Sequence, residues 1–290
     1  MEKVVRKNGP YQLTMVMTAL NEERNAPAAL REALKALEVN KISGEILFFD
    51  DGSTDRTSEV IQPIMAEHPN IRLIRHETPA GIGGCFWEGV QKCDSEVICW
   101  VAGDNEESFD GVRYMHLFKD VDIVVPFVFN REIRSFGRRV LSKIYKTVIN
   151  VSFRLLLNYQ NGAVMYRRSI LQSVKLRNFG FFYNTELLIK TLRKGYLYAE
   201  VPIALKPRNS GDSKAVTLRS LVAVIRGYLQ TLMAVYLFDK TSRSWVDGSV
   251  TLSRRLNAAR LVEEAAAAAA QQVEQDRKSD SDSKKRFVAL

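Results

Sequence analysis

The sequence predicts an α/β fold with a doubly wound, mostly parallel sheet that carries helices on both faces. Between residues 11 and 126, short apolar runs alternate with helix-like segments at regular spacing. Such alternation is typical of sheets that are built from β-α-β units. Two of the apolar runs are followed, directly or within three residues, by acidic residues. The carboxyl ends of parallel strands form the sheet edge at which α/β proteins bind their ligands.

The first half of the chain supplies most of this sheet. We expect strands at 11–18, 45–49, 71–74, 96–101 and 122–126, because each is a short apolar run bounded by turn residues. Helices are expected between them at about 27–39, 55–67, 81–93 and 109–119. Pro27 suits the first turn of its helix, whereas Pro63 is expected to kink or shorten the second helix.

Paired acids follow two of these strands. A turn with a helix cap explains most of the stretch 50–55 (DDGSTD), but not two adjacent aspartates, Asp50 and Asp51, after three apolar residues. Asp104 and Glu106 follow the strand at 96–101 and would lie on the same sheet edge. Clustered carboxylates repel one another unless a cation joins them, so Mg²⁺ or Mn²⁺ that bridges a diphosphate is the economical explanation. For Asp104 and Glu106 a solvated loop is an equally good interpretation.

The glycine-rich turn at 81–84 (GIGG) carries less information. Its spacing does not match the dinucleotide fingerprint, and no Gly-Lys-Ser/Thr follows it. A tight strand-to-helix turn is the simpler interpretation of Gly81 and its neighbours.

The second half begins with a basic amphipathic helix, expected over 138–157. Three interpretations compete: a helix on the core with a solvated basic face, a nucleic-acid surface, and a helix at a membrane surface. Nucleic acid fits poorly, because no stacking aromatic residues are interleaved with the charges. The basic residues of this region are Arg131, Arg134, Arg138, Arg139, Lys143 and Lys146.

Further elements follow. Strands are expected at 162–166 and 196–205, with a helix at 185–194 that Gly195 caps. The basic loop 206–214 suits phosphate binding, although an ordinary exposed loop is as good an interpretation. The helix expected at 216–238 either covers a groove or lies along a bilayer interface. It is the nearest approach to a membrane span, but Arg226 interrupts it.

The C-terminal tail contains an alanine run followed by a polar stretch. Six alanines at 265–270 can be helical, and 279–286 is expected to be disordered. We expect a catalytic domain at 1–215, an amphipathic segment at 216–250 and a tail at 251–290.

The net charge of +9 over 290 residues favours a partner that carries negative charge. Three cysteines without a C-x-x-C pair and no signal peptide favour a cytoplasmic protein with reduced thiols.

Seven short motifs occur in order over about residues 11–240: ALNEE (19–23), DDGSTD (50–55), GIGGCFWEG (81–89), AGDNE (102–106), RRVLSK (138–143), NGAVMYRR (161–168) and KGYLYAEVPIAL…R…GDSK (194–214). Each is weak alone, but their order and spacing are specific. Together they resemble the family 2 glycosyltransferases, and within these the branch of dolichol-phosphate mannosyltransferase and the bacterial polyprenyl-phosphate glycosyltransferases.

The resemblance implies a GT-A fold and an inverting, metal-dependent enzyme. Sugar would move from a GDP- or UDP-linked sugar to a polyprenyl phosphate, with Mg²⁺ or Mn²⁺ as cofactor. It further implies these roles: Asn21, Glu22 and Gly81 in the nucleotide pocket; Asp50 and Asp51 on the base or ribose; Asp104 and Glu106 on the metal; Arg131 and Arg139 on the donor or acceptor phosphates; Arg208, Ser213 and Lys214 in a phosphate-binding loop.

The chemistry agrees with this picture. A lipid phosphate is already an anion, so attack on the sugar needs little help from a base, and metal plus Arg or Lys stabilises the departing diphosphate. A sugar hydroxyl as acceptor would need a carboxylate base. Glu186 is the best-placed candidate for that base, but the lipid-phosphate branch has the same glutamate, so it does not decide between the acceptors.

Some positions depart from the family pattern. Thr18 stands where proline is common, Ala102 replaces the first aspartate of D-x-D, and Asn158 stands where aspartate is common. The transmembrane helices that often follow in this branch are not expected here. We therefore expect peripheral attachment to the cytoplasmic face of a membrane through 138–157 and 216–238. The alternatives are a soluble family 2 transferase with a saccharide or protein acceptor, and a catalytically silent relative that binds a nucleotide sugar or a partner protein.

Overall fold

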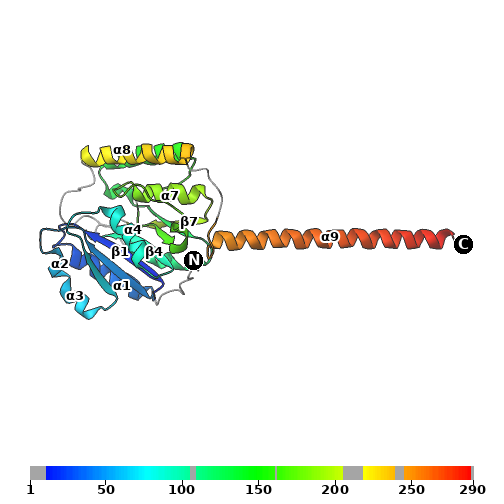
Figure 1. Cartoon of the computed structure of the whole chain (residues 1–290), viewed down its shortest axis with the longest axis horizontal. Helices are drawn as coiled ribbons and strands as arrows, with labels where there is room; N and C mark the ends of the chain where they lie inside the picture. The colour runs from blue at the N-terminus through cyan, green and yellow to red at the C-terminus, as the bar shows by residue number, and fades with distance from the viewer. Residues whose placement is uncertain (1–10, 105–108, 161, 205–217, 239–244, 289–290) are drawn as a thin grey trace.

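The centre of the protein is a seven-stranded sheet with strand order β3-β2-β1-β4-β6-β5-β7. A computed structural model describes residues 11–104, 109–160, 162–204, 218–238 and 245–288 (Figure 1). β6 runs antiparallel to both of its neighbours, and the other strands are parallel to one another. The predicted fold class is therefore confirmed. The strands are β1 (Leu13–Ala19), β2 (Gly44–Asp50), β3 (Ile71–Arg75), β4 (Val97–Ala102), β5 (Ile123–Val128), β6 (Met165–Arg167) and β7 (Tyr198–Ile203).

Helices cover both faces of this sheet. α1 and the 3₁₀-helix η1 pack on one face, and α4, α6 and α7 pack on the other. The helices are α1 (Ala26–Val39), α2 (Thr57–Val60), α3 (Gln62–Glu67), α4 (Ile82–Lys92), η1 (Phe109–Lys119), η2 (Arg131–Ile133), α5 (Phe136–Phe153), α6 (Arg168–Leu171), α7 (Tyr183–Arg193), α8 (Leu218–Met233), the π-helical turn η3 (Ala234–Phe238) and α9 (Val250–Val288).

The interior strand β1 shows why most positions of the buried strands are apolar. Successive side chains of a strand point to opposite faces, so a strand that is buried on both faces places apolar residues at adjacent positions. Met15 joins the core beneath α1, whereas Val16 joins the core beneath α4. A Cβ atom at Gly89 would lie 2.4 Å from Val16 Cγ2, so this glycine lets α4 approach the sheet closely.

Most predicted elements are present within a few residues of their expected bounds. Pro63 acts as expected: the helix predicted at 55–67 is divided into α2 and α3, and the proline lies in the first turn of α3. Two details differ. The helix at 109–119 is a 3₁₀-helix, and α5 ends at Phe153 because Arg154 adopts a left-handed backbone conformation with φ of 55°.

α8 and η3 pack against α5. Tyr228 of α8 lies 2.8 Å from Ser152 Oγ of α5, and the hydroxyl of Tyr236 donates to the carbonyl of Ser152. Phe153 packs against both tyrosine rings. Leu221–Phe238 is long and apolar enough to cross a membrane, judged by length and composition, and most of it is exposed in the structure.

The tail differs from expectation. α9 leaves the body as one extended helix that includes 279–286, where the sequence predicted disorder (Figure 1). Its first turn is anchored, because the backbone N–H groups of Val250 and Thr251 donate to the buried carboxylate of Asp122 at 2.8 and 2.9 Å. Extending a helix from a fixed first turn costs little, and the alanines at 265–270 are the strongest helix formers. The polar residues beyond them continue that helix.

Candidate functional site

The carboxyl ends of β1, β2 and β4 lie side by side at one edge of the sheet. The loops that leave these strands are joined at their bases, because the N–H of Asp51 donates to the carbonyl of Ala19 and the N–H of Gly103 donates to that of Thr18, each at 2.9 Å. β5 and β7 run in the same direction, so the segments that follow them leave from this edge as well. Among the described residues, the fold therefore brings Asp50, Asp51 and Asp104 to one edge of the sheet.

The loops after β1 and β2 hold each other in position. Asn21 adopts a left-handed conformation with φ of 55°, donates its N–H to Ser53 Oγ, and accepts from the N–H of Thr54 at 2.8 Å. The N–H of Glu22 donates to Thr57 Oγ1 at 2.9 Å. Asn21 thus lies against the 50–55 loop, and Glu22 lies against the start of α2. Thr18, where the family often has proline, accepts a hydrogen bond from Trp100 Nε1.

Asp50 and Asp51 differ in what their carboxylates contact. Asp50 is buried, and its carboxylate accepts from the N–H of Ser53 at 2.9 Å and from the hydroxyl of Ser58. These bonds fix the turn that follows β2. Asp51 instead reaches across to the segment between β3 and α4, where the N–H groups of Ala80 and Gly81 donate to its two oxygens at 2.8 and 2.9 Å.

Gly81 has a conformational reason to be glycine. Its φ is 79°, which side-chain-bearing residues rarely adopt, and a Cβ atom there would lie 2.8 Å from the carbonyl oxygen of Phe179. The N–H of Gly83 donates to the same carbonyl. The tight-turn interpretation of these glycines is correct, and in addition the turn binds Asp51.

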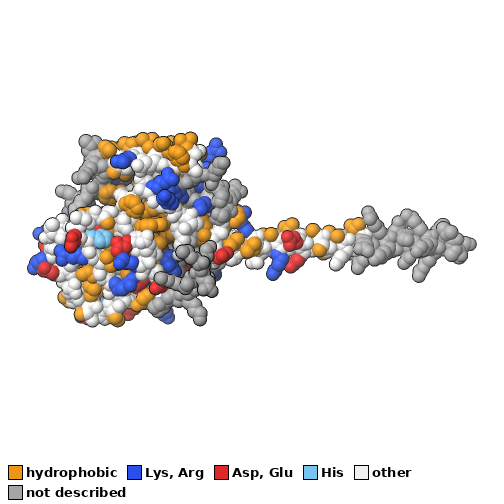
Figure 2. Space-filling model, in the orientation of Figure 1, with side chains coloured by type: hydrophobic (Ala, Val, Ile, Leu, Met, Phe, Trp, Pro, Cys, Tyr) orange, Lys and Arg blue, Asp and Glu red, His pale blue; other side chains and the backbone are white. Residues whose placement is uncertain are grey.

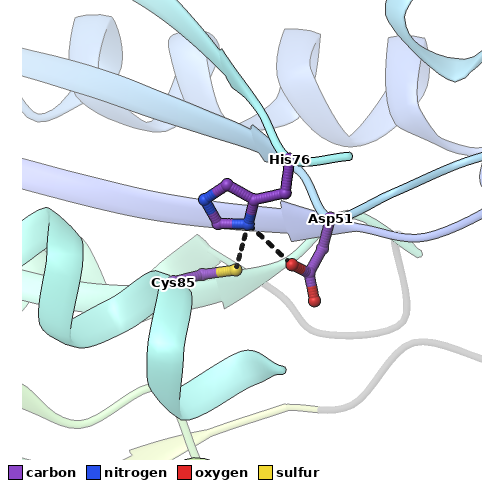
Figure 3. Close-up of side chains that lie close together, drawn as sticks. All are labelled: Asp51, His76 and Cys85. Carbon is purple, nitrogen blue, oxygen red and sulfur yellow. Dashed lines mark hydrogen bonds and ion pairs between the residues drawn. The ribbon is translucent and has the colours of Figure 1, made fainter. Parts of the chain in front are cut away.

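His76 extends this cluster (Figure 3), and Glu88 lies at the other nitrogen of its ring; neither residue was among the predicted site residues. His76 Nδ1 lies 2.8 Å from Asp51 Oδ1, and Nε2 lies 3.0 Å from Glu88 Oε2. Burial opposes the charged form of Asp51, but hydrogen bonds from His76 and the two N–H groups outweigh it and lower the pKa of this carboxyl group. His76 directly follows β3, and this position at the carboxyl end of a strand could have indicated a site residue.

Cys85 lies beside this pair, with Sγ 3.9 Å from His76 Nδ1 (Figure 3). The ligand atoms of Asp51, His76 and Cys85 are close enough together for a metal ion. However, Nδ1 and Oδ1 are at hydrogen-bonding distance, whereas two ligands of one tetrahedral zinc ion lie roughly 3.3 Å apart. Burial and the charge of Asp51 raise the pKa of the Cys85 thiol, which opposes the thiolate that a metal needs. We therefore describe the group as a hydrogen-bonded cluster.

Asp104 lies in the turn that leaves β4, on the same edge as Asp51, and is partly exposed. Gly103 brings this turn close to β1, since a Cβ atom there would lie 2.9 Å from the carbonyl oxygen of Thr18. A partly exposed carboxylate at this edge is the type of ligand that Mg²⁺ and Mn²⁺ prefer. Glu106, the second predicted ligand, lies outside the described residues, as do Arg208, Ser213 and Lys214.

The two predicted arginines lie on the segment after β5. Arg131 donates from Nε to the carbonyl of Val128 at 3.0 Å and from Nη2 to the carbonyl of Asn158 at 3.1 Å. Asn158 in turn donates to both carboxylate oxygens of Glu200. Arg139 is exposed in the first turns of α5, with its guanidinium 5.7 Å from the centre of the Phe136 ring. Arg131 is therefore held by the backbone, whereas Arg139 extends into solvent.

Glu186 is fully buried near the start of α7. Its carboxylate accepts from the N–H groups of Arg177 and Asn178 at 3.1 and 2.8 Å and from Asn178 Nδ2 at 2.6 Å. Lys190 Nζ lies 2.5 Å from it. In this arrangement the carboxylate holds the segment before α7 in place and is shielded from a substrate.

The comparisons with known proteins agree on one family. The model of Glycosyl transferase family 2 matches residues 14–175, which is more than half of the chain. The chain is 23% identical to Glycosyltransferase AglD of Haloferax volcanii over 233 residues, which are 76% of this chain and 37% of that protein. It is 25% identical to a dolichyl-phosphate beta-glucosyltransferase of Dictyostelium discoideum over 188 residues, 62% of this chain and 50% of that protein. The chain thus spans half or less of the length of these relatives.

Solved structures share the fold. Glucosyl-3-phosphoglycerate synthase from Mycobacterium tuberculosis, in complex with Mn²⁺, UDP-glucose and phosphoglyceric acid, superposes with a TM-score of 0.55 at 18% identity. The superposition covers 77% of this chain and 79% of that one. The expected GT-A fold is therefore confirmed.

Proposed function

Because the chain belongs to Glycosyl transferase family 2, we propose that it moves a sugar, with inversion, from a nucleotide diphosphate sugar to the phosphate of a polyprenyl lipid. The donor is linked to GDP or UDP. The protein acts as a peripheral enzyme on the cytoplasmic face of a membrane. The names of the dolichyl-phosphate relatives support this acceptor class, and the UDP-glucose complex of the structural neighbour supports a nucleotide sugar as donor.

The exposed apolar surface of α5 and α8 is the observation that supports a lipid acceptor at a membrane surface. The two helices pack against each other through the Ser152–Tyr228 hydrogen bond and the Phe153 ring, yet each leaves large apolar side chains in solvent. Figure 2 shows these side chains along the edge of the molecule over α8. An apolar helix face with Lys and Arg beside it suits an anionic membrane surface. The exposed residues are Phe136, Val140, Leu141, Ile144, Val148 and Val151 on α5, and Leu221, Val222, Ile225, Leu229 and Met233 on α8.

The carboxylate edge holds the donor. Asn21, Glu22, Gly81 and the 50–55 loop, which includes Asp50 and Asp51, form the nucleotide pocket. Asp104 and Glu106 would hold Mg²⁺ or Mn²⁺, and the bound ion would supply positive charge against the diphosphate leaving group. Arg131, Arg139, Arg208, Ser213 and Lys214 bind and orient the donor and acceptor phosphates.

No general base is required for this reaction. The acceptor phosphate is an anion at neutral pH, and positioning it against the anomeric carbon is the main task of the protein. The burial of Glu186 behind two backbone N–H groups and Lys190 supports this reading, because a base for a sugar hydroxyl has to reach its substrate.

One transfer assay tests the proposal. The full chain is incubated with Mn²⁺, radiolabelled GDP- and UDP-linked sugars, and polyprenyl phosphate in detergent, and the label is followed into the organic phase. We expect label transfer that depends on both the metal and the lipid phosphate. The matched control replaces polyprenyl phosphate with the corresponding polyprenol, which lacks the nucleophilic anion.

The other outcomes identify the alternatives. Release of nucleotide without labelled lipid would favour a saccharide or protein acceptor. Tight nucleotide binding without metal-dependent turnover would favour a catalytically silent relative. Either result would overturn the proposed acceptor chemistry.

A further inference from the structure

His76 stands between two carboxylates that come from different elements. Its backbone N–H donates to the carbonyl of Asp50 and so continues the pairing of β3 with β2. Its ring lies 5.6 Å from the ring of Phe49, and its side chain is only 16% exposed. On either side of the ring, Asp51 lies 2.8 Å from Nδ1 and Glu88 lies 3.0 Å from Nε2. The ring thus joins the end of β2 to α4.

With both carboxylates charged, only the imidazolium form satisfies both contacts. A neutral imidazole has one N–H and one lone pair, so one of its nitrogens would face a carboxylate oxygen without a hydrogen between them. Protonation of Asp51 would solve this problem, but its oxygens already accept the N–H groups of Ala80 and Gly81, which favour the charged carboxylate. The geometry therefore calls for a positive ring between two negative groups.

The other groups around the ring agree with this state. Burial opposes the charge, but the hydrogen bonds and charges of Asp51 and Glu88 outweigh it and raise the pKa of His76 above its ordinary value. Cys85 Sγ, 3.9 Å from Nδ1, stays a neutral thiol. Lys92 lies 3.4 Å from the second oxygen of Glu88 and stabilises that carboxylate. On the strand itself, Arg75 points to Asp50 at 3.8 Å.

We propose that His76 is a positioning residue: its imidazolium clamps Asp51 and the 79–81 turn in the form that binds the donor nucleotide. The inference rests on the proposed function, in which Asp51 contacts the base or ribose of the donor. The clamp acts on donor affinity and not on the sugar-transfer step, since the ring touches no reacting atom. Loss of one ring proton leaves a single N–H for two carboxylates, so the ring can no longer hold Asp51 and Glu88 together, and the link between the 79–81 turn and α4 is weakened.

The direction of the pH effect follows from the sign of the shift. Because the folded protein holds the ring proton to a higher pH than the unfolded chain, the clamp is complete at pH values below the ordinary histidine pKa. It is lost as the pH rises through the pKa of His76 in the folded protein. Donor affinity is therefore expected to fall on the alkaline side.

The first test measures the ring directly in the full chain. The chain has three histidines, so the ring signals in proton–nitrogen NMR spectra are assigned by comparison with His76→Gln. We expect the His76 ring to lose its proton at a higher pH than the ordinary histidine pKa, and Glu88→Gln to lower that pH. A His76 ring that is neutral at pH 7 would overturn the proposal.

The second test measures the dissociation constants of UDP and GDP with Mn²⁺ between pH 6.5 and about 9, at constant ionic strength. We expect the wild type and His116→Gln to bind the cognate nucleotide about tenfold more weakly at the alkaline end, since a charge-assisted contact is lost. His76→Gln is expected to bind the nucleotide weakly at all pH values. The remaining change of its dissociation constant with pH then comes only from titration of the nucleotide. In turnover, KM for the donor rises about tenfold while kcat stays near that of the wild type.

The outcomes separate the two proposals. Nucleotide binding that is equal in wild type and His76→Gln at every pH overturns the clamp and leaves the glycosyltransferase proposal intact. A drop in kcat with unchanged KM would likewise contradict a positioning role. If neither UDP nor GDP binds the wild type at any pH, the donor chemistry itself is wrong, and the clamp fails with it.

Discussion

Replacement of Glu186 by glutamine is expected to destabilise the protein by about 3 kcal/mol. Glu186 is fully buried, and its carboxylate accepts two backbone N–H groups and the amide of Asn178 beside the ammonium group of Lys190. Glutamine keeps one acceptor oxygen and turns the other into a donor that faces donors. Loss of one partner of a buried ion pair costs about 3–5 kcal/mol. The lower end applies, because Lys190 keeps the carbonyl of Lys175 at 2.7 Å.

Urea unfolding followed by circular dichroism measures this loss. Glu263→Gln, on the exposed part of α9, is the matched control and is expected to leave the midpoint unchanged. Lys190→Met combined with Glu186→Gln removes the unpaired charge as well. The loss of unfolding free energy in the double variant is therefore expected to be smaller than the sum of the losses in the two single variants, by about 1 kcal/mol or more.

Turnover of the same variant decides between the two roles of Glu186. Measured under conditions in which the variant is fully folded, kcat with polyprenyl phosphate is expected to stay within about tenfold of the wild type, which is less than the loss of a general base causes. A variant with unchanged stability and no turnover would show that Glu186 acts on the acceptor, and the reasoning from its burial would be refuted.

Three further substitutions test the remaining parts of the site. Asp104→Ala is expected to lower metal-dependent transfer about a thousandfold or more, and unchanged turnover would remove Asp104 from the metal site. Arg139→Ala is expected to raise KM for polyprenyl phosphate about tenfold with little change in KM for the donor, and a normal response to the lipid would contradict its role. Ile225→Glu is expected to weaken binding to anionic lipid vesicles about tenfold in a flotation assay. Val262→Glu, which places the same charge at an exposed apolar position of α9, is its control, and equal losses in both variants would contradict a membrane role for α8.

The strands of the sheet could be predicted because each is a short apolar run that ends in turn residues. The helix ends that differ from expectation depend on contacts between residues that are separated in the sequence. Arg154 ends α5 in a left-handed conformation, and this end is fixed by Asn150, whose side chain contacts the backbone of Leu157. The start of α9 depends on Asp122, far away in the sequence, whose carboxylate accepts the N–H groups of its first turn.

The acidic motifs of the site could be predicted for a similar reason. The carboxyl ends of neighbouring parallel strands meet at one edge, so residues that follow those strands come together without knowledge of any side-chain contact. The division of roles between Asp50 and Asp51 could not be predicted. It follows from the different partners of the two carboxylates: Ser53 and Ser58 for the first, and His76 with the 80–81 backbone for the second.

The segment 177–182 shows why loss of activity alone would not identify a catalytic residue here. Glu186 holds the backbone at Asn178, and the carbonyl of Phe179 accepts the N–H of Gly83 in the turn that binds Asp51. On its other side the segment supports α8, since a Cβ atom at Gly227 would lie 2.8 Å from the side chain of Asn178. A change at Glu186 therefore reaches the turn that binds Asp51, and also the exposed apolar helix α8, through direct contacts of the 177–182 segment. Stability, KM for the donor and membrane binding have to be measured together before a drop in turnover is assigned to chemistry.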